Sequence, residues 1–254
     1  MFKEVKPSRL YEDIVSQVEE AIETGKLKPG DRLPPERELK GTFNTSRRTL
    51  REGLRVLENK GLIEIKTGPK GGAFVKQMNT DKVRESLGLL IRYQYISLED
   101  LAEFRIGLEG TAALLAAQKA STEGIAELKE LLAKSKACVN KGTSTWDEFM
   151  KYESRMHLAL ARMTHNLLYE SVVQTILENI HTYYDLYLPK GKEGMLENYK
   201  HWSEIVEALE KGQPDRVSSI IKMHIRKFSQ YMKDRRFQQT KSQYGQVIRL
   251  AETT

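Results

Sequence analysis

Residues 27–58 read LKPGDRLPPERELKGTFNTSRRTLREGLRVLE, and this stretch decides the fold of the N-terminal part of the chain. Its first half predicts a short helix opening at Pro34–Arg37, because proline is tolerated in the first turn and Glu36 suits the positive helix end. Its second half predicts another helix over residues 45–58, which Thr45 or Ser46 can cap. The buried stripe of this second helix would consist of Leu50, Leu54 and Leu57.

The flanking segments complete a small domain. Residues 9–24 predict an amphipathic helix, because apolar residues recur at every fourth position from Leu10 to Ile22. Residues 62–66 and 73–75 have the composition of strands, and the glycine-rich segment 68–72 between them is typical of a turn. Three helices followed by a two-stranded hairpin outline a winged helix-turn-helix, with residues 45–58 as the recognition helix.

The positive charge of the chain is concentrated in the same region. The 254 residues include 41 Lys and Arg and 35 Asp and Glu, a net charge of +6. Residues 37–76 hold ten basic and four acidic residues, which accounts for all of that excess. Such a concentration of basic residues is typical of a protein that binds an anionic partner such as nucleic acid, but a solvated basic face with no partner would have it too.

The start of the predicted recognition helix has the side chains that read DNA. Arg47, Arg48, Thr49 and Arg51 would lie over the base edges of the major groove. Arginine donates two hydrogen bonds to guanine, and threonine contacts bases or phosphate. The turn at 68–72 would bring the backbone of the wing close to the sugar–phosphate edge, although its glycines can also serve the turn geometry alone.

From about residue 80 the sequence predicts an all-helical bundle, so the chain as a whole is mainly α. A connecting helix is expected over 81–95, and strand signals are almost absent beyond it. Further helices are expected over 98–120, 122–140, 146–163, 167–188, 196–211 and 214–235. The predicted domains are a winged helix-turn-helix (1–78), a connecting helix or linker (79–97), a helical effector and dimerisation domain (98–236) and a polar tail (237–254).

Several classes of protein are excluded by composition. The single Cys138 leaves no internal disulfide framework and no cysteine-rich zinc module. No run reaches the roughly 18–20 apolar residues of a membrane span. Residues 1–7 have no apolar signal core. We therefore expect a cytoplasmic protein.

Four residues of the helical half are candidate metal ligands. Glu153 and His157 are four residues apart, so they share one helix face. His224 lies on the last predicted helix and His201 on the one before, and facing helices of a bundle can converge such side chains. A structural role for each histidine is the alternative.

The N-terminal motifs resemble those of the GntR family of transcription regulators. Residues 27–39 resemble the start of its DNA-binding domain, residues 45–58 its recognition helix and residues 61–75 its wing. Lys40 and Thr45 depart from the family pattern at the turn. The resemblance implies DNA contacts at Arg37, Ser46, Arg47, Thr49, Arg51 and Gly68, to which we add Arg48, where the family varies, and Lys70 in the wing turn.

Residues 98–226 resemble the FCD effector domain of the FadR subfamily. The motifs are residues 98–109, 153–166 and 205–212, with His224 beyond them. The resemblance implies a divalent metal held by an acid and three histidines beside a small carboxylate effector. It places Glu153 at the acid position, with His157 and His224 as the first and last histidines.

The middle histidine of the family falls on Trp202, and His201 is one residue early. One residue is about 100° of rotation on a helix, so the ring of His201 would need a local bulge to reach the site. A metal-free pocket is therefore the alternative. Zinc, nickel and manganese all suit such ligands.

Two further residues are predicted to bind the effector, Arg105 and Asn166. A buried arginine can clamp a carboxylate with two hydrogen bonds, which is the role that the resemblance favours for Arg105. The alternative is an internal ion pair with Glu109, which is four residues further on. Asn166 can equally be a cap or turn residue.

The sequence thus predicts a metabolite-responsive repressor, not an enzyme. It would bind a palindromic operator as a homodimer and sense a small organic acid in the helical domain. One alternative is an architectural DNA-binding protein without a functional effector site. The other is a metal-dependent hydrolase with Glu153 as its base.

Overall fold

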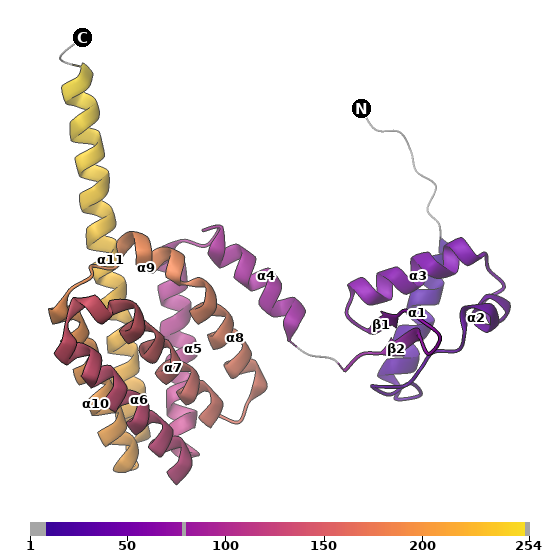
Figure 1. Cartoon of the computed structure of the whole chain (residues 1–254), viewed down its shortest axis with the longest axis horizontal. Helices are drawn as coiled ribbons and strands as arrows, with labels where there is room; N and C mark the ends of the chain where they lie inside the picture. The colour runs from indigo at the N-terminus through magenta and orange to yellow at the C-terminus, as the bar shows by residue number, and fades with distance from the viewer. Residues whose placement is uncertain (1–8, 78–79, 252–254) are drawn as a thin grey trace. The chain divides into compact units, whose positions relative to one another are not determined.

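The computed structural model describes residues 9–77 and 80–251 (Figure 1). Residues 1–8, 78–79 and 252–254 lie outside the described residues. The prediction that residues 1–7 have no signal core, the predicted end of the DNA-binding domain at 78 and the end of the predicted tail fall in these segments. The chain divides into two compact units, one up to Lys82 and the other from Val83.

The first unit is the predicted winged helix-turn-helix. Its helices are α1 (Arg9–Glu23), α2 (Glu36–Thr42) and α3 (Arg47–Asn59). Its strands β1 (Ile63–Lys66) and β2 (Gly72–Val75) pair antiparallel, with Ile63 opposite Val75. The predicted elements are all present, and the order of three helices and a hairpin is confirmed.

The core of this unit fixes the position of α3. Leu50, Leu54 and Leu57 are buried as predicted, and they pack with Ile14 and Val18 of α1. Leu10, the first member of the predicted stripe of α1, is instead 57% exposed. Because α3 carries the buried leucines on one face, its other face is free to meet a partner.

Replacing Leu50 with Ala is expected to lower the free energy of unfolding of this unit by about 2–5 kcal/mol, because Leu50 is fully buried and its truncation leaves a cavity. Leu10→Ala is the matched control, with an expected loss under about 0.5 kcal/mol at an exposed site. Urea unfolding followed by circular dichroism measures both. Equal losses would mean that α3 is not anchored at Leu50.

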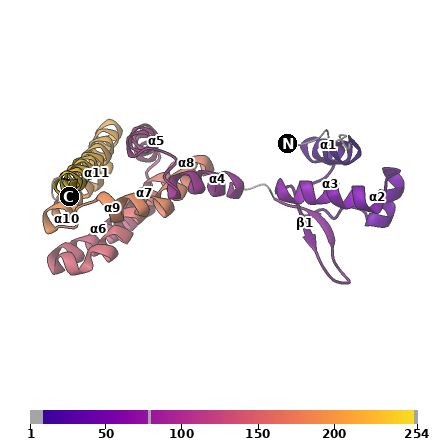
Figure 2. The ribbon, with the colours of Figure 1, turned by 90° about the horizontal axis from the view of Figure 1, so that it is seen from above.

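The second unit is an all-helical bundle (Figures 1 and 2). Its helix α5 packs against α11 and α7, and α10 packs against α11 and α6. The elements are α4 (Asp81–Arg92), α5 (Leu98–Gln118), α6 (Thr122–Lys141), the 3₁₀ turn η1 (Thr143–Thr145), α7 (Trp146–Met163), α8 (Leu167–Asn179), α9 (His181–Tyr187), α10 (Lys192–Glu210) and α11 (Pro214–Ala251). None of the helices in the described part of the chain is long and apolar enough to cross a membrane.

Helix boundaries differ from the prediction by three residues or more in four places. α10 begins at Lys192, four residues before the expected start at 196. The helix expected over 167–188 is interrupted at Ile180 and forms α8 and α9. α4 ends at Arg92, and Gln94 after it has a φ of 56°. α11 continues to Ala251, whereas a weakly patterned tail was expected after 236. Lysine, arginine and glutamine have high helix propensity, so this segment forms a helix without an apolar stripe.

The predicted connecting helix packs on the bundle. Arg84 of α4 donates to Glu178 at 2.9 Å, and Arg92 donates to Asn179 of α8 at 3.0 Å. A Cβ added at Gly88 would lie only 3.0 Å from the Asn179 side chain, so the absence of a side chain lets α4 approach α8. The α4 helix is therefore part of the second unit except for its first two residues.

Candidate DNA-binding face and candidate metal centre

The start of α3 is fixed by a side-chain cap. The Ser46 hydroxyl oxygen accepts a hydrogen bond from the backbone N–H of Thr49 at 3.1 Å. The two hydroxyl groups also lie 2.9 Å apart. This cap satisfies a backbone donor of the first turn and sets the direction from which α3 begins.

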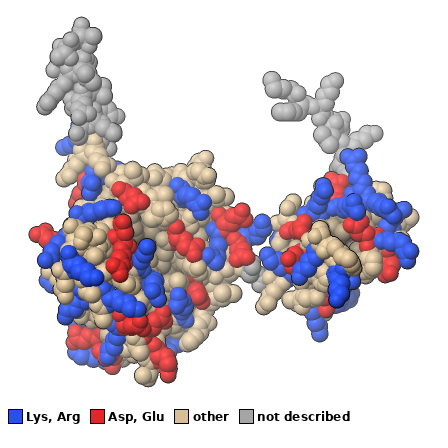
Figure 3. All heavy atoms as spheres, in the orientation of Figure 1, with Lys and Arg blue, Asp and Glu red and all other residues tan. Residues whose placement is uncertain are grey.

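Four arginines share one face of α3. Arg47, Arg51 and Arg55 lie on successive turns, and with Arg48 they line a shallow surface hollow. All four are exposed, while the leucines of α3 face the core. Figure 3 shows Lys and Arg side chains spread over the surface of this unit. The arrangement places a concentrated positive charge along the predicted recognition helix.

The other predicted DNA contacts also lie at the surface. Arg37, Ser46, Gly68 and Lys70 are exposed, and Thr49 is half-buried beside its cap. Gly68 has a φ of +99°, so the turn of the wing requires glycine there on conformational grounds.

Arg51 also contacts the neighbouring helix. Its Nε donates to Glu36 Oε2 of α2 at 3.0 Å, and both side chains are exposed. An exposed pair of this kind adds little stability, so it can open when a phosphate or base competes for the guanidinium.

Three predicted metal ligands converge inside the second unit. Glu153 and His157 project from α7 and His224 from α11, and all three are buried. Glu153 Oε1 lies 2.8 Å from His157 Nε2 and 3.2 Å from His224 Nε2. The three possible ligand atoms lie within 4.8 Å of one another. The spacing of Glu153 and His157 on one face of α7 brings these two side chains together, and α11 adds the third.

This group of residues fits a divalent metal ion. The second carboxylate oxygen of Glu153, Oε2, is buried and has no hydrogen-bond partner. Two imidazoles and one carboxylate are ligands that zinc and other first-row transition metals accept. Three protein ligands would leave positions open for water or a small molecule.

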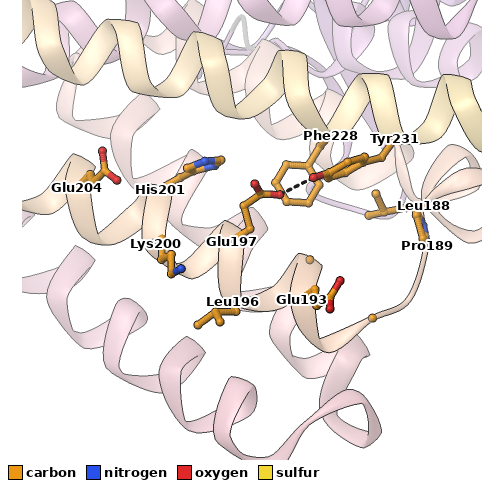
Figure 4. A pocket seen from close by; sticks show the side chains of 12 residues that line it. Leu188, Pro189, Glu193, Leu196, Glu197, Lys200, His201, Glu204, Phe228 and Tyr231 are labelled. Atoms are coloured by element: carbon orange, nitrogen blue, oxygen red, sulfur yellow. Dashed lines mark hydrogen bonds between the residues drawn. The ribbon is translucent and has the colours of Figure 1, made fainter.

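His201 lies outside this group in the part of the chain that the structure describes, and its role as a fourth ligand stays a prediction. Its Nδ1 lies 3.3 Å from Nδ1 of His224, whereas His224 faces Glu153 with its other ring nitrogen, Nε2. Its ring lines a separate pocket of about 610 Å³ with Glu197, Lys200 and Glu204 (Figure 4). The one-residue offset has turned the ring away from Glu153, as rotation about a regular helix requires.

Trp202 is the residue at the position that the family resemblance gives to the middle histidine. It is fully buried, and its ring meets the His157 ring edge-on at a centroid distance of 4.9 Å. Its Nε1 has no hydrogen-bond partner. The indole therefore packs against the cluster and supplies no ligand atom.

Arg105 forms the internal ion pair that was the alternative to a free effector contact. Its Nε donates to Glu109 Oε1 at 2.6 Å, and its Nη1 donates to the Tyr184 hydroxyl at 3.0 Å. Glu109 Oε2 in turn contacts His157 Nδ1. From the sequence, Glu109 was expected only as an ion-pair partner of Arg105.

Electrostatics in the cluster follow from burial and from the two carboxylates. Burial favours the neutral form of Glu109, but Arg105 and then His157 outweigh it and lower its pKa to about 2. Burial also opposes a charged His157, yet Glu109 and Glu153 raise its pKa to about 9. Burial lowers the pKa of His224 to about 4. Positive and negative charges therefore alternate along the cluster.

Asn166 lies at the start of α8. Its side-chain oxygen accepts from the backbone N–H of Leu168 at 3.0 Å, and the residue is exposed. The side chain thus has the cap role that was the alternative to effector binding.

Comparisons with known proteins match both units. The profile described as "Bacterial regulatory proteins, gntR family" matches residues 10–75, and that of the FCD domain matches residues 100–227. HTH-type transcriptional regulator LutR of Bacillus subtilis is 26% identical over 208 residues, which cover 80% of this chain and 92% of LutR. HTH-type transcriptional repressor NanR of Klebsiella aerogenes is 27% identical over 231 residues, 87% of this chain and 84% of NanR. The structure of Streptococcus agalactiae GntR has a TM-score of 0.60 at 21% identity, covers 87% of this chain and 99% of its own, and supports the fold.

Proposed function

The chain belongs to the GntR family of bacterial regulatory proteins and carries an FCD domain, and from this premise we propose that it is a metabolite-responsive repressor. LutR and NanR are transcription regulators, and this chain is a transcription regulator of the same family and not an enzyme. The hydrolase alternative is thereby excluded. The proposal rests above all on a second, helical unit that holds a buried Glu–His cluster alongside a DNA-binding unit.

Operator binding is assigned to the basic face of α3. Arg47, Arg48 and Arg51 would meet base edges and phosphates, with Thr49, Ser46 and Arg37 beside them and Gly68 and Lys70 in the wing. Two such helices reading half-sites about one helical turn apart require a homodimer and a palindromic operator. A repressor of this kind works in the cytoplasm, where the operator lies.

The affinity of the protein for DNA is expected to fall steeply with salt. If arginines and lysines contact 6–10 phosphates, raising the salt concentration from 50 to 200 mM should lower the affinity for DNA by about 10³–10⁵-fold. Fluorescence anisotropy with labelled DNA, selected by this protein from a random pool, measures the slope. A flat salt dependence would mean that the basic face of α3 does not bind the DNA backbone.

The Glu153, His157 and His224 cluster is proposed to hold a divalent metal such as zinc, nickel or manganese. Bound there, the ion would supply two positive charges and open coordination positions. Since the carboxylate of Glu109 is already paired with Arg105, the added charge favours an anionic ligand such as a small organic acid. For Arg105 to clamp the carboxylate of this ligand, the ligand would have to replace Tyr184 at Nη1, because Nε is held by Glu109. Asn166 would likewise have to give up its cap contact with Leu168.

Ligand binding must favour one arrangement of the two DNA-binding units in the dimer, because a ligand with equal affinity for both states changes nothing. The remaining alternative is an architectural DNA-binding protein that ignores metabolites. A thermal-shift screen with small carboxylates, repeated after dialysis against a chelator, separates the two. Stabilisation that needs metal supports the sensor, and no stabilisation by any carboxylate supports the architectural protein.

A further inference from the structure

We infer that Glu109 is the positioning residue of the proposed metal centre, holding the His157 ring so that Nε2 faces the ion. This inference rests on the metal site proposed above. Glu109 lies on α5, whereas the three candidate ligands lie on α7 and α11. It is as deeply buried as they are.

The two nitrogens of His157 face two different carboxylates. Nε2 lies 2.8 Å from Glu153 Oε1, on the side where the ligand atoms converge. Nδ1 is buried on the other side and has no regular hydrogen bond, and its partner there is Glu109 Oε2, with which it forms an ion pair. A neutral imidazole carries its proton on one nitrogen and a lone pair on the other. A carboxylate at Nδ1 keeps the proton there, which leaves the Nε2 lone pair for a metal.

Glu109 is itself held in place by contacts that reach another helix. Its Oε1 accepts from Arg105 Nε at 2.6 Å, and Arg105 Nη1 donates to Tyr184 of α9 at 3.0 Å. The paired charges make a buried carboxylate tolerable at this depth. Because Arg105 takes Oε1, the other oxygen, Oε2, is directed at His157.

Glu109 is not placed to be a ligand itself. The group of possible ligand atoms found among the described residues contains Glu153, His157 and His224 and omits Glu109. Its contact is with the ring nitrogen opposite to the one that faces Glu153. Trp202 packs edge-on against the same ring, so the ring is restrained by a polar contact and an apolar one.

The test is the affinity of purified full-length protein for zinc, measured by competition with a coloured chelator. Glu109→Gln keeps the shape of the side chain and an acceptor oxygen but removes the charge. We expect its affinity for zinc to fall by about 10–100-fold, the usual effect of losing an outer-sphere partner of a metal ligand. The absorption bands of bound cobalt(II) should change as well, because the ligand field at His157 changes.

Two further variants keep this test decisive. Glu109→Gln leaves Arg105 buried without its partner, so the double variant Arg105→Met with Glu109→Gln removes both charges and protects the fold. Ser218→Ala is the matched control, because the Ser218 hydroxyl donates to Gly110 O at 2.7 Å and joins α11 to α5 without touching the cluster. Its thermal stability should fall while its affinity for zinc stays that of the parent.

The outcomes separate the two proposals. Weaker zinc binding in both Glu109 variants, with Ser218→Ala unchanged, supports the inference. Parent-like zinc binding in either Glu109 variant overturns it and leaves the metal centre standing. If the parent binds neither zinc nor cobalt, the metal centre itself is wrong and the role of Glu109 falls with it.

Discussion

Replacing Arg47 and Arg51 together with alanine should weaken binding to the selected operator by about 2–6 kcal/mol, because each specific arginine contact contributes roughly 1–3 kcal/mol. This corresponds to about 30-fold to 10⁴-fold in affinity, with smaller losses on random DNA. The two side chains lie one turn apart on the exposed face of α3, opposite the buried leucines. Sequence preference should therefore be lost along with affinity.

The measurement is fluorescence anisotropy on operator and random duplexes at one fixed salt concentration. Arg226→Ala is the matched control, since Arg226 is exposed on α11 in the other unit. Circular dichroism establishes that the double variant folds, which is expected because both arginines are exposed. If the double variant prefers the operator as strongly as the parent does, α3 is not the recognition helix.

Elemental analysis should find about one divalent metal ion per chain in protein purified without a histidine tag or chelator, and none in His157→Ala. His157 contributes one of three converging ligand atoms, and the loss of one leaves a buried pair too weak to retain the ion during purification. Chelator treatment of the parent should lower its melting temperature, because the ion binds only the folded site.

His201→Ala is the informative control for this measurement. His201 contacts the far nitrogen of His224 and lines a separate pocket, so its removal should leave the metal content unchanged. Loss of metal from His201→Ala would restore the four-ligand site that the family resemblance implies. Metal-free parent protein would mean that the site has no metal and that the alternating charges alone hold the cluster together.

Local rules predicted most of the fold. The cap Ser46 and the leucine periodicity of α3 are properties of neighbouring residues, so the sequence contains them. The extension of α11 was missed because its helical propensity has no apolar stripe to reveal it.

The metal site was predictable only in part. The four-residue spacing of Glu153 and His157 predicted that both side chains lie on one face of a helix, and the family resemblance added His224. The turn of His201 away from the group followed from a one-residue offset that helix geometry already indicated. The contacts of Glu109 with His157 and of Arg105 with Tyr184 join α5 to α7 and α9, and no spacing along the chain contains them.

A ligand in the helical unit is proposed to control operator binding, and one measurement tests this directly. Operator affinity is measured by anisotropy on metal-loaded protein, with and without a small carboxylate that raises the melting temperature. Operator affinity is expected to change by about 5–150-fold, the usual range of coupling between two sites. An operator affinity that stays the same with every such carboxylate would contradict this proposal and leave an architectural DNA-binding protein.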